Sequence, residues 1–275
     1  MNIKALLKIA VGYAARVSYL RGGLTMIYVW WNHDAHVNRL HPFDRMLGIN
    51  TGGSLPAYLL QSGKAADSHI TAYCGVVPSV LRTVLATVPD ASDRSFIDLG
   101  AGKGRALAVA SEFPFRAILG IELNPDLCRV AARNAAIVRI RYPDRTRIEV
   151  QEGDASRPLL PDGPLVVMFY HSFRATLVRR LVDNLATAAA TREILFIYVN
   201  PVYGAIIDNH KSFSRWFAEQ ILLAPDEIDY SSDTTEAVVI WRTGPPSHLA
   251  STPRTESNAN RVIIVEKPEW RAELV

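Results

Sequence analysis

The chain has 275 residues, 49% hydrophobic and 21% charged, which allows one large domain with a sizeable core and excludes wholesale disorder. A formal net charge of +3 is too small to indicate a nucleic-acid partner, so we expect none. The two cysteines, Cys74 and Cys128, form no Cys-x-x-Cys or Cys/His cluster and therefore predict a reducing, cytoplasmic setting without disulfide or zinc.

The N-terminal segment is basic: residues 1–33 hold no acidic residue, while Lys4, Lys8, Arg16 and Arg21 lie among aliphatic side chains. This pattern predicts a basic amphipathic helix. Charges interrupt the apolar stretch too often for a bilayer span, and no signal-peptide core is evident. The helix either contacts an anionic membrane surface or packs on the main domain. We favour packing, because an aromatic stretch follows it.

Three histidines, His33, His36 and His41, lie close to Asp34 and Asp44 and raise the question of a metal site. Their spacing matches no His-Glu-x-x-His motif. We therefore predict that the protein binds no metal.

The most informative stretch is residues 95–110, where an apolar run enters Asp98-Leu-Gly-Ala-Gly-Lys-Gly-Arg105 and an Ala/Leu/Val-rich segment follows. It predicts a buried strand, a tight glycine turn that lets a ligand approach the backbone, and a helix. A dinucleotide fingerprint would need glycine in place of Arg105, and a phosphate-binding loop would need Ser or Thr in place of Gly104. A turn that binds no ligand remains the alternative.

The same alternation of strand and helix continues along the chain. Asn124 as N-cap and Pro125 as first helical residue predict one helix, and Ser172 is expected to cap another. Two short strands without a strong helix between them come last. The strands are predicted over residues 116–121, 147–151, 164–170, 193–199, 220–223 and 236–241.

The segment after residue 243 is rich in Pro, Ser, Thr and Asn. We predict a flexible connection there, with an extra edge strand at residues 261–266. The predicted organisation is an N-terminal helical or cap region over 1–69, a main domain over 70–243 and this connection over 244–275.

The glycine turn resembles motif I of the class I S-adenosylmethionine-dependent methyltransferases, and the order of elements over residues 70–243 resembles their sheet. Phe43-Asp-Arg-Met-Leu-Gly-Ile-Asn-Thr51 and Thr71-Ala-Tyr-Cys-Gly-Val-Val-Pro78 make the chain similar to a set of uncharacterised bacterial methyltransferases. The chain departs from them at Ala101, where they carry Ser, and at His171-Ser172, where they often carry Asn-Pro. The resemblance implies an α/β fold: a Rossmann-like class I methyltransferase sheet, mostly parallel, with an antiparallel strand near the C-terminal end and helices on both faces.

The resemblance also implies S-adenosylmethionine as cofactor, bound outside the carboxyl ends of the strands. An acid ends each of three successive predicted strands. Glu122 would accept from the ribose hydroxyls, Asp154 from the adenine amino group, and Asp98 would face the amino group of the methionine part. The implied cofactor-binding residues are Asp98, Gly100, Ala101, Gly102, Gly104, Glu122, Leu123, Asp154 and Ala155.

The end of the fourth strand holds the candidate catalytic residues, His171 and Tyr170. A neutral imidazole accepts a proton near pH 7, so His171 is the candidate general base, with a polar residue that only flanks a helix as the alternative. Tyr73, Phe173, Asn200 and Tyr203 are expected to shape the acceptor pocket.

The leading hypothesis is methyl transfer to a nitrogen or oxygen of a small molecule or a protein side chain. The alternative is a catalytically inactive, methyltransferase-like module that binds a ligand or a partner. A nicotinamide-dependent oxidoreductase is a third hypothesis.

Overall fold

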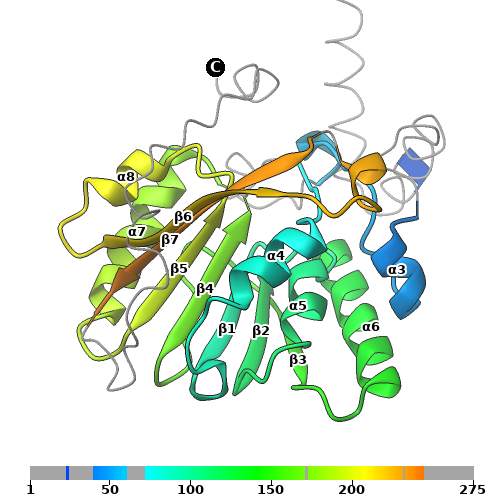
Figure 1. Ribbon diagram of the computed structural model, residues 1–275, viewed down its shortest axis with the longest axis horizontal. Coiled ribbons are helices and arrows are strands. Elements are labelled where there is room, and N and C mark those ends of the chain that lie inside the picture. The colour runs from blue at the N-terminus through cyan, green and yellow to red at the C-terminus, as the bar shows by residue number, and fades with distance from the viewer. Residues whose placement is uncertain (1–22, 25–39, 61–71, 171–172, 232, 245–275) are drawn as a thin grey trace, which may run out of the picture.

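A seven-stranded sheet with the order β3-β2-β1-β4-β5-β7-β6 organises the protein (Figure 1). The computed structural model describes residues 23–24, 40–60, 72–170, 173–231 and 233–244. The first five strands are parallel, and β7 runs antiparallel to both of its neighbours. The strands are β1 (Ser95–Leu99), β2 (Ala117–Glu122), β3 (Ile148–Glu152), β4 (Leu165–Tyr170), β5 (Ile194–Val199), β6 (Ser214–Leu222) and β7 (Thr235–Thr243).

Helices cover both faces of the sheet (Figure 1). Successive residues of a strand point to opposite faces, so Val166 and Met168 pack with α4 and α5, while Val167 and Phe169 pack with α7. The helices are α3 (Pro42–Leu47), α4 (Pro78–Leu85), α5 (Arg105–Ala110), α6 (Pro125–Arg141), α7 (Ala175–Ala188) and α8 (Gly204–Asp208), with short 3-10 turns at Ala57–Leu59, Ala91–Asp93 and Ile228–Tyr230. Strands β4 and β5 are buried on both faces, as their continuous apolar runs predict.

The prediction of the fold is confirmed: an α/β protein with a mostly parallel sheet, antiparallel pairing near its C-terminal end, and helices on both faces. The predicted start of α6 is also confirmed. The Asn124 side chain accepts hydrogen bonds from the N–H groups of Asp126 and Leu127, and Pro125 is the first helical residue.

The predicted capping role of Ser172 is wrong. Helix α7 begins at Ala175, and its N-cap position is taken by Arg174 in extended conformation, without a side-chain cap. The buried ring of Phe173 packs on Phe169 of β4, with ring centroids 5.6 Å apart, and this contact holds the chain on the sheet before the helix begins.

Strand β6 begins six residues before its predicted start at Gln220. A β-bulge between Arg215 and Phe217 explains the difference, because Trp216, Phe217 and Ala218 are then all buried and the apolar alternation typical of a strand is lost. The predicted N-terminal amphipathic helix and the predicted strand at 261–266 fall on residues outside those described. Across the described ranges, no helix is long and apolar enough to cross a bilayer.

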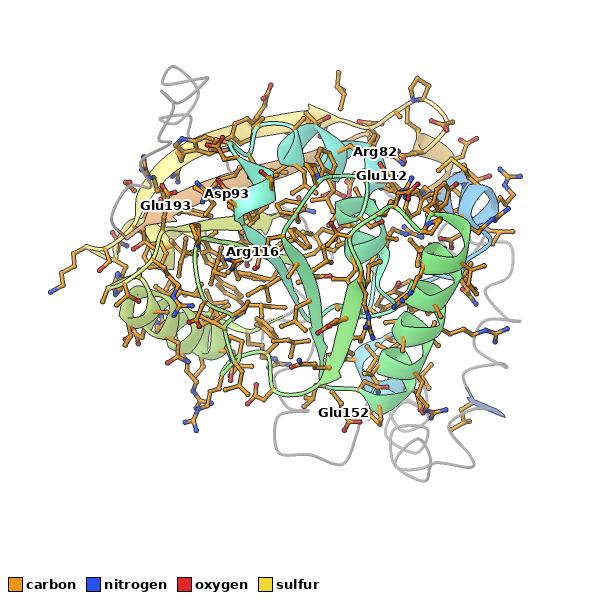
Figure 2. All side chains as sticks on the ribbon, turned by 90° about the horizontal axis from the view of Figure 1, so that it is seen from below. Arg82, Asp93, Glu112, Arg116, Glu152 and Glu193 are labelled. Carbon is orange, nitrogen blue, oxygen red and sulfur yellow. The ribbon has the colours of Figure 1, made fainter. Side chains whose placement is uncertain are left out.

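Ion pairs brace the helices and the amino ends of the strands (Figure 2). Arg82 of α4 makes two hydrogen bonds to Glu112, the shorter 2.6 Å long. The buried Glu193 carboxylate pairs with Arg94 and Arg242, each at 2.6 Å. These ion pairs lie away from the carboxyl ends of the parallel strands.

Candidate cofactor pocket

A pocket opens at the carboxyl ends of the parallel strands, where ligands of open α/β sheets bind. Eight of the nine residues predicted for the cofactor line it: Asp98, Gly100, Ala101, Gly102, Glu122, Leu123, Asp154 and Ala155. The ninth, Gly104, precedes α5 with φ of 83° and packs against Ala131 of α6 instead.

Asp98 follows the apolar core of β1 and is only 5% exposed. Its carboxyl group lines the pocket and makes no hydrogen bond to any residue within the described ranges. Burial, and then the negative charge of Glu122, raise the pKa of Asp98 to about 7. A cation placed in the pocket would stabilise the ionised form of this carboxyl group.

Glu122 ends β2, and its carboxylate binds the backbone on both sides of the pocket. One oxygen accepts the N–H of Gly102 at 2.7 Å, and the other accepts the N–H of Asn124 at 2.8 Å. A carboxylate offers about four acceptor positions, so it can bind several donors at once. Glu122 therefore orients the glycine turn as well as the pocket wall.

Asp154 lies in the turn after β3, and its Oδ1 accepts the N–H of Ser156 at 2.9 Å. The carbonyl of Ser156 accepts in turn from Asn184 of α7 at 2.8 Å. These bonds hold the Asp154 carboxyl at the pocket edge, two strands away from Asp98.

Tyr73 covers the glycine turn from the side of the N-terminal segment. A Cβ on Gly102, which has φ of +54°, would come 2.6 Å from Cδ2 of Tyr73. The hydroxyl of Tyr73 donates to the carbonyl of Thr51 at 2.6 Å, and this bond holds the ring in place. The Tyr73 ring therefore excludes a side chain at position 102, whether or not a ligand is bound.

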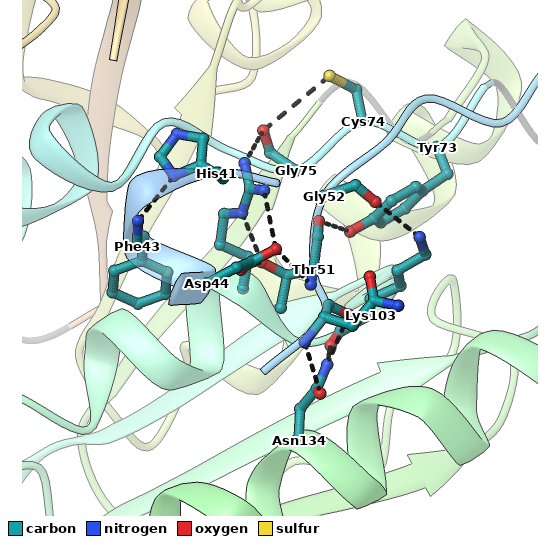
Figure 3. A network of polar contacts seen from close by, with 12 residues as sticks. His41, Phe43, Asp44, Thr51, Gly52, Tyr73, Cys74, Gly75, Lys103 and Asn134 are labelled. Atoms are coloured by element: carbon teal, nitrogen blue, oxygen red, sulfur yellow. Dashed lines mark hydrogen bonds and ion pairs between the residues drawn. The ribbon is translucent and has the colours of Figure 1, made fainter. Parts of the chain in front are cut away.

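A buried polar network connects the segment after α3 to the start of α5 (Figure 3). The Asp44 carboxylate accepts the N–H of Thr51 at 2.8 Å and also the Thr51 hydroxyl. The same hydroxyl oxygen accepts from Nε of Arg105 at 2.7 Å, and Arg105 also forms an ion pair with Asp44 at 3.9 Å. The Phe-Asp-Arg element and the residue that follows the glycine turn, Arg105, are thus joined by one hydrogen-bond network.

Two more contacts close this network around the glycine turn. The ammonium group of Lys103 donates to the carbonyl of Gly52 at 2.6 Å, and burial lowers its pKa to about 8. The amide of Asn134 in α6 donates to the carbonyls of Asn50 and Lys103, at 2.9 and 2.8 Å (Figure 3). Residues 50–52 are therefore attached to both α5 and α6, although the sequence places them in the predicted N-terminal cap region.

The candidate catalytic residue Tyr170 ends β4 and lines the pocket. Its hydroxyl donates to Glu236 at 3.3 Å, and Glu236 also accepts from the amide of Asn200. Burial, and then the charge of Glu236, raise the pKa of Tyr170 well above its ordinary value, so the phenol stays protonated. His171 lies outside the described residues, and its role stays a prediction.

Of the residues predicted to shape the acceptor pocket, Tyr73 and Phe173 line it, whereas Asn200 and Tyr203 do not. Sequence reasoning missed Glu236, which is 2% exposed. It is the first residue of the strand predicted over 236–241, and nothing in the neighbouring residues indicates that its carboxylate is buried. No cluster of three metal-ligating side chains occurs within the described ranges.

No family model and no curated protein matches the chain. Solved structures match at low identity. A Listeria monocytogenes protein assigned to the class I S-adenosylmethionine-dependent methyltransferases is 14% identical over 65% of this chain and 62% of its own, with a TM-score of 0.46.

Two further matches have the same character. Escherichia coli yhhF, assigned as a methyltransferase, is 14% identical over 70% of this chain and all of its own, with a TM-score of 0.46. Haemonchus contortus phosphoethanolamine N-methyltransferase 1, solved with phosphoethanolamine and S-adenosylhomocysteine, is 13% identical over 62% of this chain and 44% of its own, with a TM-score of 0.43. The alignments thus span less than two thirds of the Listeria and Haemonchus proteins. By its strand order and its antiparallel β7, the chain has the fold of the class I S-adenosylmethionine-dependent methyltransferases.

Proposed function

We propose that the protein binds S-adenosylmethionine and transfers its methyl group to a nitrogen or oxygen of a small molecule or a protein side chain. The observation that carries this proposal is the buried Asp98 carboxyl, which has no hydrogen bond to the described residues and opens onto the same pocket as the glycine turn and Glu122. A carboxyl group in this state is suited to a ligand that brings a cation.

Three acidic residues at the carboxyl ends of neighbouring strands match the three polar parts of the cofactor in the same order. Neighbouring strands lie about 5 Å apart, so Asp154, Glu122 and Asp98 form a row of roughly 10 Å along the sheet edge. Asp154 would accept from the adenine amino group, Glu122 from the ribose hydroxyls, and Asp98 would pair with the ammonium of the methionine part. Each of these roles remains a proposal.

The cofactor supplies an activated methyl group, so the protein mainly has to align the acceptor and exclude water. Tyr170 and Phe173 would form the wall on the side of β4 where the acceptor enters. His171 would accept the proton of an acceptor that must lose one.

Isothermal titration with S-adenosylmethionine, S-adenosylhomocysteine and NADH tests the cofactor directly. We expect the first two to bind and NADH not to bind. Binding of NADH alone would overturn the proposal in favour of an oxidoreductase. Transfer of labelled methyl groups into metabolites and lysate proteins then separates the two remaining functions, because an inactive module would bind the cofactor and label nothing.

We also expect the protein to act in the cytoplasm, on acceptors other than nucleic acid, as the cysteine content and the small net charge predict. Fractionation of cells that express the tagged chain tests the first expectation. Methyl transfer into purified RNA or DNA would contradict the second.

A further inference from the structure

Helix α6 carries a stripe of exposed residues on the side turned away from the core. Arg129, Arg133, Ala136 and Ile140 follow one another at intervals of three or four residues, and all four are exposed. This spacing places them on one face of the helix. The buried residues of the same helix, among them Val138, occupy the other face and pack on the core. The core therefore does not dictate which residues form the outer stripe.

Helix α3 extends this surface. It lies beside α6 (Figure 1), and Nη1 of Arg141 donates to the carbonyl of Met46 at 3.4 Å. Arg141 follows Arg133 by eight residues, which turns it toward the α3 flank of the stripe. Six exposed side chains on the two helices, which we call the α3–α6 patch, are Arg45, Met46, Arg129, Arg133, Ile140 and Arg141.

The two helices concentrate positive charge. They hold five exposed arginines and two aspartates, which gives a net charge equal to the +3 of the whole chain. Neither aspartate offsets the patch freely, because Asp44 is buried with Thr51 and Asp126 pairs with Arg129. An anionic partner is therefore attracted to this part of the surface.

Apolar side chains lie exposed among these arginines. Ile140 is 81% exposed and Met46 is 53% exposed, and Leu40, just before α3, is 55% exposed. Each would gain free energy by leaving water. A nucleic-acid backbone would pair with the arginines but would leave Ile140 in water. The interface of a bilayer accepts both, because lipid phosphates bind arginine and the acyl boundary receives aliphatic groups.

The sequence before the patch has the same sign of charge. Residues 1–33 contain basic side chains and no acidic one. Like charges repel, so this segment is a poor occupant of the α3–α6 patch, whereas an anionic surface attracts both. The charges thus favour a partner outside the chain.

We propose that the α3–α6 patch docks the protein on an anionic lipid bilayer. Arg45, Arg133 and Arg141 contact the lipid phosphates, and Met46 and Ile140 enter the boundary of the acyl chains. Binding of this kind is reversible and weakens with salt, so part of the protein is also recovered in soluble form. This inference goes beyond the proposed function and does not depend on the cofactor.

Co-sedimentation of the full chain with vesicles tests the proposal. One set of vesicles contains phosphatidylcholine alone, and the other contains about 30% phosphatidylglycerol, both in about 0.1 M NaCl. We expect binding to the anionic vesicles only, and release in about 1 M NaCl. Arg133→Glu/Arg141→Glu should weaken binding at least about tenfold, and Ile140→Ala about threefold.

The matched control is Arg179→Glu/Arg180→Glu, which reverses two exposed arginines on α7, the helix on the other face of the sheet. It changes the net charge equally and should alter vesicle binding less than about twofold. If Arg133→Glu/Arg141→Glu fails to fold by circular dichroism, Arg133→Glu alone decides, with an expected loss of about fivefold.

Three results would overturn the proposal. The first is no binding to anionic vesicles, or equal binding to both sets. The second is unchanged binding in the α6 variant, which would assign membrane contact to residues 1–33. The third is tighter binding of polyuridylic acid than of vesicles, lost in the same variant, which would assign the patch to nucleic acid.

Discussion

The ring of Tyr73 lies against Gly102 so closely that a methyl group on Gly102 would come 2.6 Å from Cδ2 of the ring. Tyr73 is in turn held by the carbonyl of Thr51, and Gly102 by the carboxylate of Glu122. The glycine turn is thus clamped between an N-terminal segment and the end of β2. Its shape is a property of this packing.

Gly102→Ala should destabilise the protein by about 1–3 kcal/mol, from backbone strain at positive φ and from the clash with Tyr73. The clash should disappear in the Tyr73→Ala background, where the cost of Gly102→Ala should fall to about 1 kcal/mol of backbone strain. Urea unfolding of the two single variants and the double variant measures the coupling. An equal cost of Gly102→Ala in both backgrounds would rule out the steric contact. Gly102→Val adds branched bulk at the same place and should abolish cofactor binding.

Glu122→Ala should weaken S-adenosylhomocysteine binding by about 1.5–3 kcal/mol, the scale of hydrogen bonds to a charged group. The variant also removes the acceptor of the Gly102 N–H, so the turn itself loses support. Glu152→Ala is the matched control, because Glu152 pairs in register with Glu122 on β3, is exposed and does not line the pocket. Unchanged affinity in Glu122→Ala by isothermal titration would remove Glu122 from the site.

Asp98 should make both stability and cofactor affinity depend on pH. Its pKa is raised from 3.8 to about 7 in the folded protein, chiefly by burial, so the folded protein holds a proton that the unfolded chain releases. The contribution of Asp98 to the free energy of unfolding therefore falls as pH rises from 3.8 to about 7.

Affinity for S-adenosylhomocysteine should change in the opposite direction, because its ammonium pairs with the ionised carboxylate. We expect Kd to fall with rising pH and to level off above about 7. Asp98→Asn should flatten this profile and also the pH dependence of unfolding, with unfolding and titration measured over the same pH series. A profile that keeps its slope in Asp98→Asn would assign the dependence to another group.

Thr51→Val should destabilise the protein by about 1–3 kcal/mol, because it leaves Asp44 and Arg105 without their shared hydroxyl partner in a buried site. Thr83→Val, which removes an exposed hydroxyl bonded to the Ser79 carbonyl within α4, is the control and should cost much less. Chemical unfolding of both variants checks this. Equal costs would mean that the network around Arg105 adds no stability of its own.

His171→Ala should lower turnover by about 10²–10⁴-fold and leave S-adenosylmethionine affinity nearly intact, if His171 serves as the general base. The measurement requires the acceptor found by the labelled-methyl screen. Near-full turnover in the variant would assign His171 to the pocket wall and leave the reaction to alignment of the acceptor.

The sequence alone was sufficient for the features that depend on neighbouring residues. Three such features are the cap by Asn124, the apolar runs of β4 and β5, and the glycine turn after β1. Each depends on residues within a few positions of one another, through their hydrophobic periodicity and backbone preferences. Topology then follows, because parallel strands joined by helices bring their carboxyl ends to one edge. Even local reasoning failed where packing overrode it, at Ser172 before α7 and at the bulge in β6.

Contacts between distant segments were decided only by the tertiary structure. The sequence contains Phe43-Asp-Arg and the Lys103-Gly-Arg turn as separate motifs, and nothing in either indicates that Thr51 joins them. Likewise, Glu236 lies 66 residues after Tyr170, and it meets Tyr170 because β7 enters the sheet antiparallel beside β5. Such pairings depend on how whole helices and strands dock. The docking free energy is the sum of many weak packing contacts along the chain, so the sequence of one segment does not identify the segment that it contacts.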